Sequence, residues 1–211
     1  MDKEVNFLRS ISIELPLKMI MMRLGYRNTK TVLSVKQREN IQETIMDGFS
    51  MCKAQGCWRV VEIAEKTEES VVLENGHVLK SKLLASLLKA SSAVVFMAST
   101  VGSVIVDAAT KAISDGDGAK AVIYDAVGGQ CADVVMDWVN EYVRSQLMRK
   151  AQRLTVHRFS PGYGGLDLAN QKQIYDLLKL DSLGLQLTER YMLLPEKSVT
   201  AIAGIESGIK L

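Results

Sequence analysis

The segment that most constrains the fold is Ala93–Ala98, an uninterrupted apolar run that reads Ala-Val-Val-Phe-Met-Ala. Its length is that of a strand and well below the roughly 18 residues that a membrane span requires. A strand without polar alternation presents apolar side chains on both of its faces. The run therefore predicts a strand that is buried on both sides.

The elements expected around this strand are mixed rather than alternating regularly. Apolar periodicity and turn residues predict helices over 14–23, 34–52, 83–88, 101–114, 119–152 and 170–178. Strand formers predict strands over 57–63, 70–73, 77–79, 154–158, 190–194 and 198–205. Because no βαβ alternation is visible, the predicted class is α+β. No linker divides the chain, so we expect a single domain over 1–211. Whether residues 1–90 form a small N-terminal lobe of helices and strands within it is left open.

Local signals sharpen three of these elements. Ser34-Val-Lys-Gln37 has the spacing of a helix capping box, and Asn75-Gly76 is typical of a hairpin turn. The helix over 14–23 has little polar face, so we expect it to be well buried. Its methionines, Met19–Met22, are then interpreted as core filler rather than as a docking surface.

The long helix over 119–152 contains an unfavourable pair, Gly128-Gly129. A glycine inside a helix costs about 1 kcal/mol relative to alanine. A close approach by another helix or by a ligand would explain that cost.

Composition excludes several classes of protein. The chain has 211 residues, with 26 Lys and Arg against 24 Asp and Glu, and its net charge of +2 gives no electrostatic argument for nucleic-acid binding. No apolar run is long enough for a membrane span, so no membrane is expected. An odd number of cysteines (Cys52, Cys57 and Cys131) and a start without an apolar signal region predict a cytoplasmic protein with free thiols.

The common catalytic motifs are absent from the sequence. There is no phosphate-binding loop of the Gly-x-x-x-x-Gly-Lys-Ser/Thr type and no Gly-x-Ser-x-Gly elbow. His77 and His157 are far apart and lie outside metal-ligand motifs, and Cys52 and Cys57 are best interpreted as buried thiols. The sequence therefore names no catalytic residue and no metal ligand.

One segment is suited to ligand binding: Arg158-Phe-Ser-Pro-Gly-Tyr163. An arginine can hold a carboxylate through two hydrogen bonds, and a tyrosine ring attracts a cation such as a sulfonium. Pro161 and Gly162 make a rigid turn that lets a ligand approach the backbone. On spacing alone, a structural turn in which Arg158 pairs with a surface acid is the favoured alternative.

The order of several motifs resembles the activation domain of cobalamin-dependent methionine synthase, which binds S-adenosylmethionine. The resemblance spans most of residues 17–205, and its specific part is Arg158–Tyr163. Weaker matches support it in sequence order: Leu24-Gly25-Tyr26, Ser99–Gly102, Asp125-Ala126, Ala132-Asp133, Gln171, Leu187-Thr188 and Pro195–Val199.

This resemblance implies a fold, a ligand and a partner. The fold would be a twisted antiparallel sheet flanked by helices. The chain would bind S-adenosylmethionine and support reductive methylation of cob(II)alamin on a separate corrinoid-binding methyltransferase, with a flavodoxin-type reductant as electron donor. Cobalamin would be bound only by that partner. Whether this chain is a subunit of the methyltransferase is therefore left open. The implied ligand-binding residues are Arg158, Ser160, Pro161, Gly162, Tyr163, Asp125 and Asp133.

The sequence also departs from the family pattern. Gly164–Asp167 follow the turn where the family carries a Cys-Pro segment, and no tyrosine follows Tyr191. A non-catalytic interaction or assembly protein that has lost ligand binding is therefore the alternative function. A methyltransferase acting on another substrate is a weaker third. The basic stretch 141–158 holds five cations and one acid, which suits either an acidic partner or the dipole of the preceding helix.

Overall fold

The structure, a computed structural model, describes residues 4–26 and 33–208. Its main element is a seven-stranded, wholly antiparallel sheet in the order β4-β3-β2-β5-β9-β6, with β1 added beside β2. The strands are β1 (Asn6–Leu8), β2 (Gln55–Lys66), β3 (Ser70–Leu73), β4 (Val78–Lys80), β5 (Ser91–Thr100), β6 (Gln152–Leu154) and β9 (Ser198–Ser207). A separate two-stranded hairpin joins β7 (Gln186–Leu187) to β8 (Leu193–Leu194).

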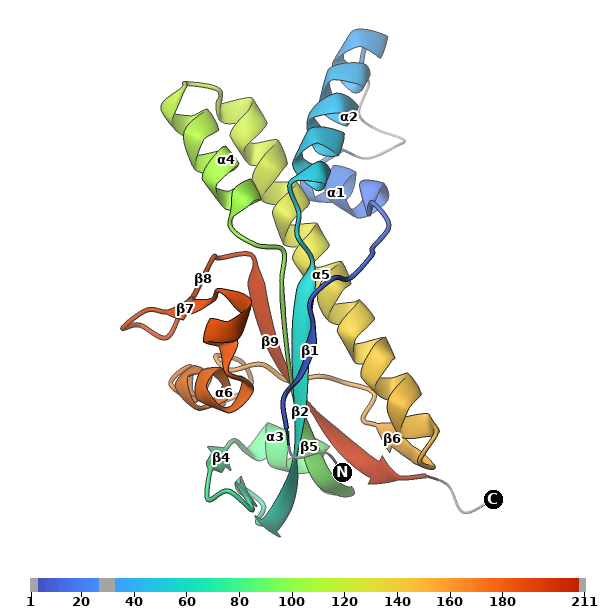
Figure 1. The fold of residues 1–211 in the computed structure, drawn as a ribbon, viewed down its shortest axis with the longest axis vertical. Coiled ribbons are helices and arrows are strands. Elements are labelled where there is room, and N and C mark those ends of the chain that lie inside the picture. The colour runs from blue at the N-terminus through green and yellow to red at the C-terminus, as the bar shows by residue number, and fades with distance from the viewer. Residues whose placement is uncertain (1–3, 27–32, 209–211) are drawn as a thin grey trace.

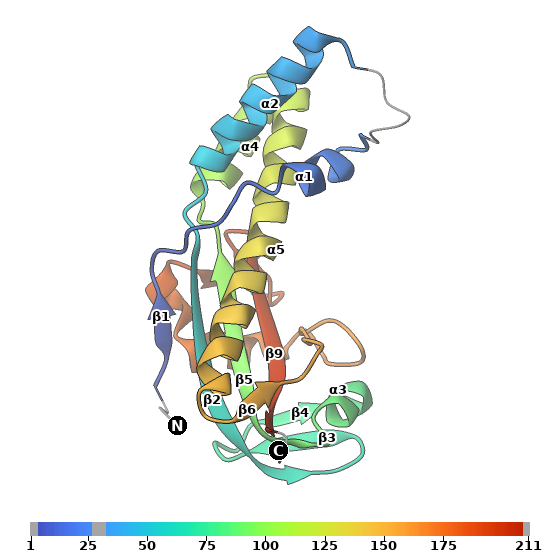
Figure 2. The same ribbon diagram turned by 90° about the vertical axis from the view of Figure 1, so that its right-hand side faces the viewer.

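Helices cover both faces of this sheet (Figure 1). They are α1 (Leu17–Arg23), α2 (Val35–Ser50), α3 (Lys82–Leu87), α4 (Val104–Ser114), α5 (Gly118–Met148), α6 (Asn170–Leu178) and the 3-10 helix η1 (Leu180–Leu183). Figure 2 shows that the C-terminal half of α5 lies across the sheet, whereas its N-terminal half extends beyond the sheet and carries α1, α2 and α4. The α+β class and the antiparallel sheet flanked by helices are confirmed.

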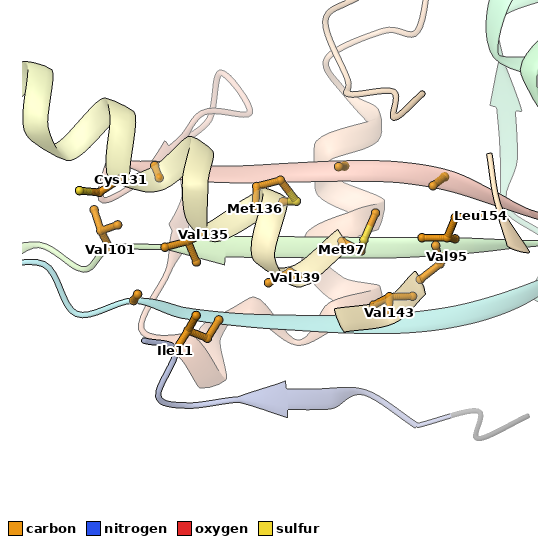
Figure 3. Packing of buried hydrophobic residues seen from close by; sticks show 14 of the residues in the cluster. Ile11, Val95, Met97, Val101, Cys131, Val135, Met136, Val139, Val143 and Leu154 are labelled. Atoms are coloured by element: carbon orange, nitrogen blue, oxygen red, sulfur yellow. The ribbon is translucent and has the colours of Figure 1, made fainter. Parts of the chain in front are cut away.

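Strand β5 lies between two hydrophobic cores, as its apolar run predicts. Ala93, Val95 and Met97 pack into the core on the α5 side, which contains Val135, Val139 and Val143 of that helix (Figure 3). The alternate residues Val94, Phe96 and Ala98 pack into the core on the α6 side, which also receives side chains from α3 and η1. The polar side chains of β5 that are buried, Ser91, Ser99 and Thr100, lie at its two ends, so the middle of the strand is apolar on both faces.

Several local predictions are confirmed. Ser34 and Gln37 form the capping box at the start of α2, and Ser81 caps α3 by accepting a hydrogen bond from the Leu84 amide. Strands β3 and β4 pair as the Asn75-Gly76 turn predicts, with Gly76 at φ +83°. The three cysteines are free thiols.

The prediction that the first helix is well buried is wrong. Helix α1 starts only at Leu17, and Ile20 is its buried residue. Met19 and Met22 are 51% and 58% exposed, so they are not core filler. Helix α1 has only two turns and packs mainly on α5, so part of its surface stays exposed whatever its hydrophobicity.

The strand predicted over 154–158 is displaced. Strand β6 ends at Leu154, because the Thr155 hydroxyl replaces a backbone carbonyl as acceptor for the Gly204 amide at 3.0 Å. The chain returns to the sheet only at Phe159, which forms a single bridge with Ile202. The strand predicted over 190–194 is also shorter, because β8 contains only Leu193–Leu194. Strand β1 and helix η1 were not predicted at all.

None of the helices in the described part of the chain combines the length and apolar character that crossing a membrane demands.

Candidate functional site

The segment Phe159–Leu166 is held against the sheet by strand β9. The Phe159 amide and carbonyl both bond to Ile202, at 2.8 and 2.7 Å. One residue later, the Ser160 hydroxyl donates to the Thr200 carbonyl at 2.8 Å. These three bonds fix the start of the turn, so its position follows that of the central sheet.

The turn itself depends on glycines. Gly162 has φ +88°, a conformation that other L-residues rarely adopt, and its amide bonds to the Leu166 carbonyl at 2.8 Å. Gly164 also has positive φ, and a Cβ there would lie 2.3 Å from the Phe159 ring. The glycines at 162 and 164 are therefore required by the closed path of the backbone, and the turn leaves Tyr163 on the surface, 73% exposed.

Beside this turn lies an open groove of about 1090 Å³. Its walls are the 160–163 turn, the β7–β8 hairpin and the start of β9, and Gln171 of α6 contributes to its floor. On that floor the buried Thr200 hydroxyl donates to the Gln171 side-chain oxygen at 2.8 Å. The groove is lined by Ser160, Pro161, Gly162, Tyr163, Leu168, Gln171, Thr188, Glu189, Arg190, Tyr191, Met192, Leu193, Leu194, Glu196, Ser198, Val199 and Thr200.

Arg158 turns in the other direction, toward α5. Its Nη1 donates to the Asp137 carboxylate at 2.7 Å, and about a third of its side chain is exposed. It is not among the residues that line the groove. The pairing with a surface acid that the sequence left as an alternative is therefore present, and its partner lies on helix α5.

Asp125, Asp133 and Asp137 follow one another on α5 at intervals of eight and four residues, so they share one face of that helix. The Lys197 ammonium lies 2.5 Å from the Asp125 carboxylate. We call these three carboxylates, with Arg23, Lys197 and Arg158, the charged face of α5.

The glycine pair of α5 lies on this charged face. A Cβ on Gly128 would lie 3.1 Å from the side chain of Lys197, and one on Gly129 would lie 3.2 Å from the guanidinium of Arg23. The close approach that the glycines predicted is therefore made by Arg23 at the end of α1, by Lys197 in the turn before β9, and by Ile105 of the neighbouring helix α4, which would lie 3.4 Å from a Cβ on Gly128.

Asp133 lies between these cations. Partial removal of its carboxyl from water raises its pKa, and the neighbouring Asp137 adds to this effect. Arg23, Arg158 and Lys197 act in the opposite direction, because each favours the charged carboxylate.

The residues expected from the sequence thus fall into two neighbouring groups. Ser160, Pro161, Gly162 and Tyr163 line the groove. Asp133 and Arg158 lie on the charged face, and Asp125 lines a second, smaller pocket of about 420 Å³ between α4 and α5. The segment 158–163 connects the two groups, since it begins on the charged face and ends in the groove.

Several residues of this region were missed by the sequence. Glu189 and Tyr191 lie in the hairpin loop, and Tyr191 falls within the strand that was predicted over 190–194. Arg23 was missed because the glycine pair indicated a close approach without indicating its partner. Gln171 belonged to the family-like motifs, although only the fold shows that it forms the groove floor.

The lining of the groove, within the residues that the structure describes, contains no histidine and no cysteine. Within residues 4–26 and 33–208, no group of three or more His, Cys, Asp and Glu side chains could hold a metal ion. Burial raises the pKa of the Cys57 thiol to about 12, which keeps it protonated and unreactive at neutral pH.

Comparison of structures supports the fold, whereas comparison of sequences finds no relative. The sequence matches no protein-family model and no curated protein. Among solved structures it matches a crystal structure of the MetH reactivation domain bound to AdoHcy, with a TM-score of 0.68 over 99% of this chain and 80% of that chain, at 13% sequence identity. The chain therefore has the α+β fold of the methionine synthase reactivation domain.

Proposed function

We propose that this chain is a reactivation module that binds S-adenosylmethionine and supports reductive methylation of cob(II)alamin on a separate corrinoid-binding protein. The observation that carries the proposal is the Arg158–Tyr163 segment. In a chain with the fold of the MetH reactivation domain, this segment borders a groove large enough for a nucleoside-sized ligand. That solved domain is bound to AdoHcy, the demethylated form of the proposed ligand.

The side chains along the segment suit the chemical groups of S-adenosylmethionine. The Arg158 guanidinium has five N–H donors, and its bond to Asp137 uses Nη1, so further donors can hold a carboxylate. The exposed ring of Tyr163 offers a π face to the sulfonium. Asp125 and Asp133 remain candidates for the ligand's ammonium group, because both face the same side of α5.

The proposed chemistry asks little of the protein. Bound S-adenosylmethionine supplies a methyl group that its sulfonium already activates, so no general base is needed. The work of this chain is to hold the ligand in one orientation and to present its methyl group toward the corrinoid of the partner. A flavodoxin-type protein is the proposed source of the electron that reduces the corrinoid.

Titration calorimetry with S-adenosylmethionine tests the proposal. Replacing Arg158 by alanine removes charge-assisted hydrogen bonds to the ligand carboxylate and is expected to weaken binding by about 10- to 100-fold. Arg153→Ala is the matched control. Arg153 also pairs with an acid, Glu206 at 2.8 Å, but its pairing lies at the edge of the sheet, away from the segment.

Binding that Arg158→Ala leaves intact would overturn the site assignment, and no binding by the wild-type chain would overturn the proposed function. The activity is then tested directly. Conversion of cob(II)alamin to methylcobalamin on a candidate corrinoid protein should depend on this chain, on S-adenosylmethionine and on a reductant.

An interaction or assembly role without ligand binding is the second candidate. The pairing of Arg158 with Asp137 favours it, because that ion pair satisfies the arginine internally. Such a protein would be recovered with the corrinoid protein equally well in the presence and in the absence of S-adenosylmethionine.

A further inference from the structure

Tyr191 has a backbone conformation that tyrosine rarely adopts. Its φ is +62°, in the left-handed region that favours glycine and, to a lesser degree, asparagine. The residue lies at the end of the loop between β7 and β8, where Leu187 pairs with Leu193. The loop itself therefore explains the conformation but not the choice of a tyrosine.

The hydrogen bonds around this loop define its geometry. The Thr188 amide bonds to the Met192 carbonyl, and the Tyr191 amide bonds to the Thr188 carbonyl, both at 2.9 Å. The Met192 amide also donates to the Thr188 hydroxyl at 3.0 Å. This is a three-residue hairpin loop whose third position is left-handed, a position normally given to glycine.

A strained residue that the fold does not require is a sign of function at that residue. The side chain of Tyr191 lines the same groove as Tyr163, and the two tyrosines are 38% and 73% exposed. The charged residues in the lining are Glu189, Glu196 and Arg190, so carboxylates outnumber cations. Tyrosine rings and carboxylates together attract a cation and have no comparable attraction for a neutral group.

We propose that Tyr191, with Tyr163 and Glu189, makes the groove selective for a sulfonium ligand over the corresponding neutral thioether. The inference rests on the proposed function, and it adds a selectivity that the function does not require. The chain would bind S-adenosylmethionine, the methyl donor, in preference to S-adenosylhomocysteine, the spent form. Such a preference would release the product after each methyl transfer.

The test compares the dissociation constants of these two ligands by titration calorimetry. The wild-type chain is expected to prefer S-adenosylmethionine by about tenfold, the size of a partly desolvated cation–π contact. Tyr191→Gly suits the left-handed backbone and so keeps the loop, but it removes the ring and should bring the ratio close to one. Tyr191→Phe keeps a π face and should retain most of the preference.

Ala151→Gly is the control for the backbone change. Ala151 also has positive φ, +53°, but it lies between α5 and β6 and does not line the groove. This variant relieves the same kind of backbone strain and should leave the ratio of the two dissociation constants unchanged. Thermal unfolding of all variants verifies that each one folds cooperatively.

The outcomes separate the two proposals. If both ligands bind and Tyr191→Gly leaves their ratio at the wild-type value, the inference about Tyr191 is wrong while the proposed function stands. A wild-type chain that binds both ligands equally also overturns the inference alone. If neither ligand binds the wild-type chain, the proposed function fails and the inference fails with it.

Discussion

The Arg158–Tyr163 segment separates two regions that are built in opposite ways. On one side, the charged face of α5 pairs its groups internally: Asp125 with Lys197, and Asp137 with Arg158. On the other side, the groove leaves Tyr163, Glu189 and Tyr191 exposed. The charged face thus holds Arg158 in place through an ion pair, whereas the groove leaves its tyrosine side chains exposed to solvent.

This difference teaches which substitutions should affect stability and which should affect binding. A buried hydrogen bond beneath the groove has no substitute in water, so its loss should reduce the free energy of unfolding. An exposed ion pair on the charged face is screened by water and should contribute little. The following predictions test this contrast, from the largest expected effect to the smallest.

The largest effect is expected at the floor of the groove. Thr200→Val removes the hydroxyl that donates to Gln171 and leaves the buried oxygen of that side chain without its partner. The free energy of unfolding should fall by about 1–3 kcal/mol. Thr44→Val is the matched control, because the exposed Thr44 hydroxyl bonds only within α2, to the Asn40 carbonyl. Urea unfolding measures both, and equal losses for the two variants would contradict the prediction.

A smaller effect on the free energy of unfolding is expected when the ion pair between Asp137 and Arg158 is removed. Asp137→Asn removes the charge that pairs with Arg158, but this ion pair is 65% exposed on the aspartate side. The free energy of unfolding should change by less than about 1 kcal/mol, as for the exposed control Asp115→Asn, which breaks a pair with Lys111. Binding of S-adenosylmethionine should persist, since the arginine keeps its donors. A loss of binding as large as that of Arg158→Ala would show that Asp137 itself takes part in binding the ligand.

The smallest effect concerns Asp133 and depends on pH. Its pKa is raised in the folded chain, so the folded state binds more protons than the unfolded state as pH rises above the ordinary value of 3.8. As pH rises from 3.8 to the raised pKa of Asp133, the free energy of unfolding therefore falls. It stays at this lower level at neutral pH, where Asp133 is ionised in both states. Asp133→Asn should be slightly more stable than the wild-type chain at pH 7 and equal to it at about pH 3.

Urea unfolding at several pH values measures this difference. Parallel stability curves for Asp133→Asn and the wild-type chain would contradict the prediction, because they would mean that the three neighbouring cations balance the loss of hydration. A wild-type chain that becomes more stable than Asp133→Asn at pH 7 would mean that the cations outweigh it and stabilise the ionised carboxylate.

Much of the fold was predictable because its signals are local. The apolar run 93–98 predicted a strand buried on both faces, and β5 lies between two cores. The Ser34–Gln37 capping box and the Asn75-Gly76 turn depend on residues three positions apart or fewer, so they were predicted correctly. The short strand β1 has no such signal, because it exists only through its pairing with β2.

The candidate site was predictable only in part. The turn Pro161–Tyr163 is encoded by its own residues, and the structure places it in the groove wall. The hairpin loop was hidden, because Tyr191 adopts a backbone conformation that its residue type argues against. The glycine pair of α5 indicated a close approach, but its partners come from positions 23, 105 and 197, too distant in the sequence to be inferred.

The sequence by itself determined the central strand, the caps and turns, and the Arg158–Tyr163 segment, since these depend on side chains acting within a few residues. Only the tertiary structure decided that Arg158 faces Asp137, that two cations lie over the glycines of α5, and that Tyr191 shares a groove with Tyr163. The physical reason is that hydrogen bonding and backbone preference act locally, whereas packing and charge pairing act between whatever surfaces the fold brings together.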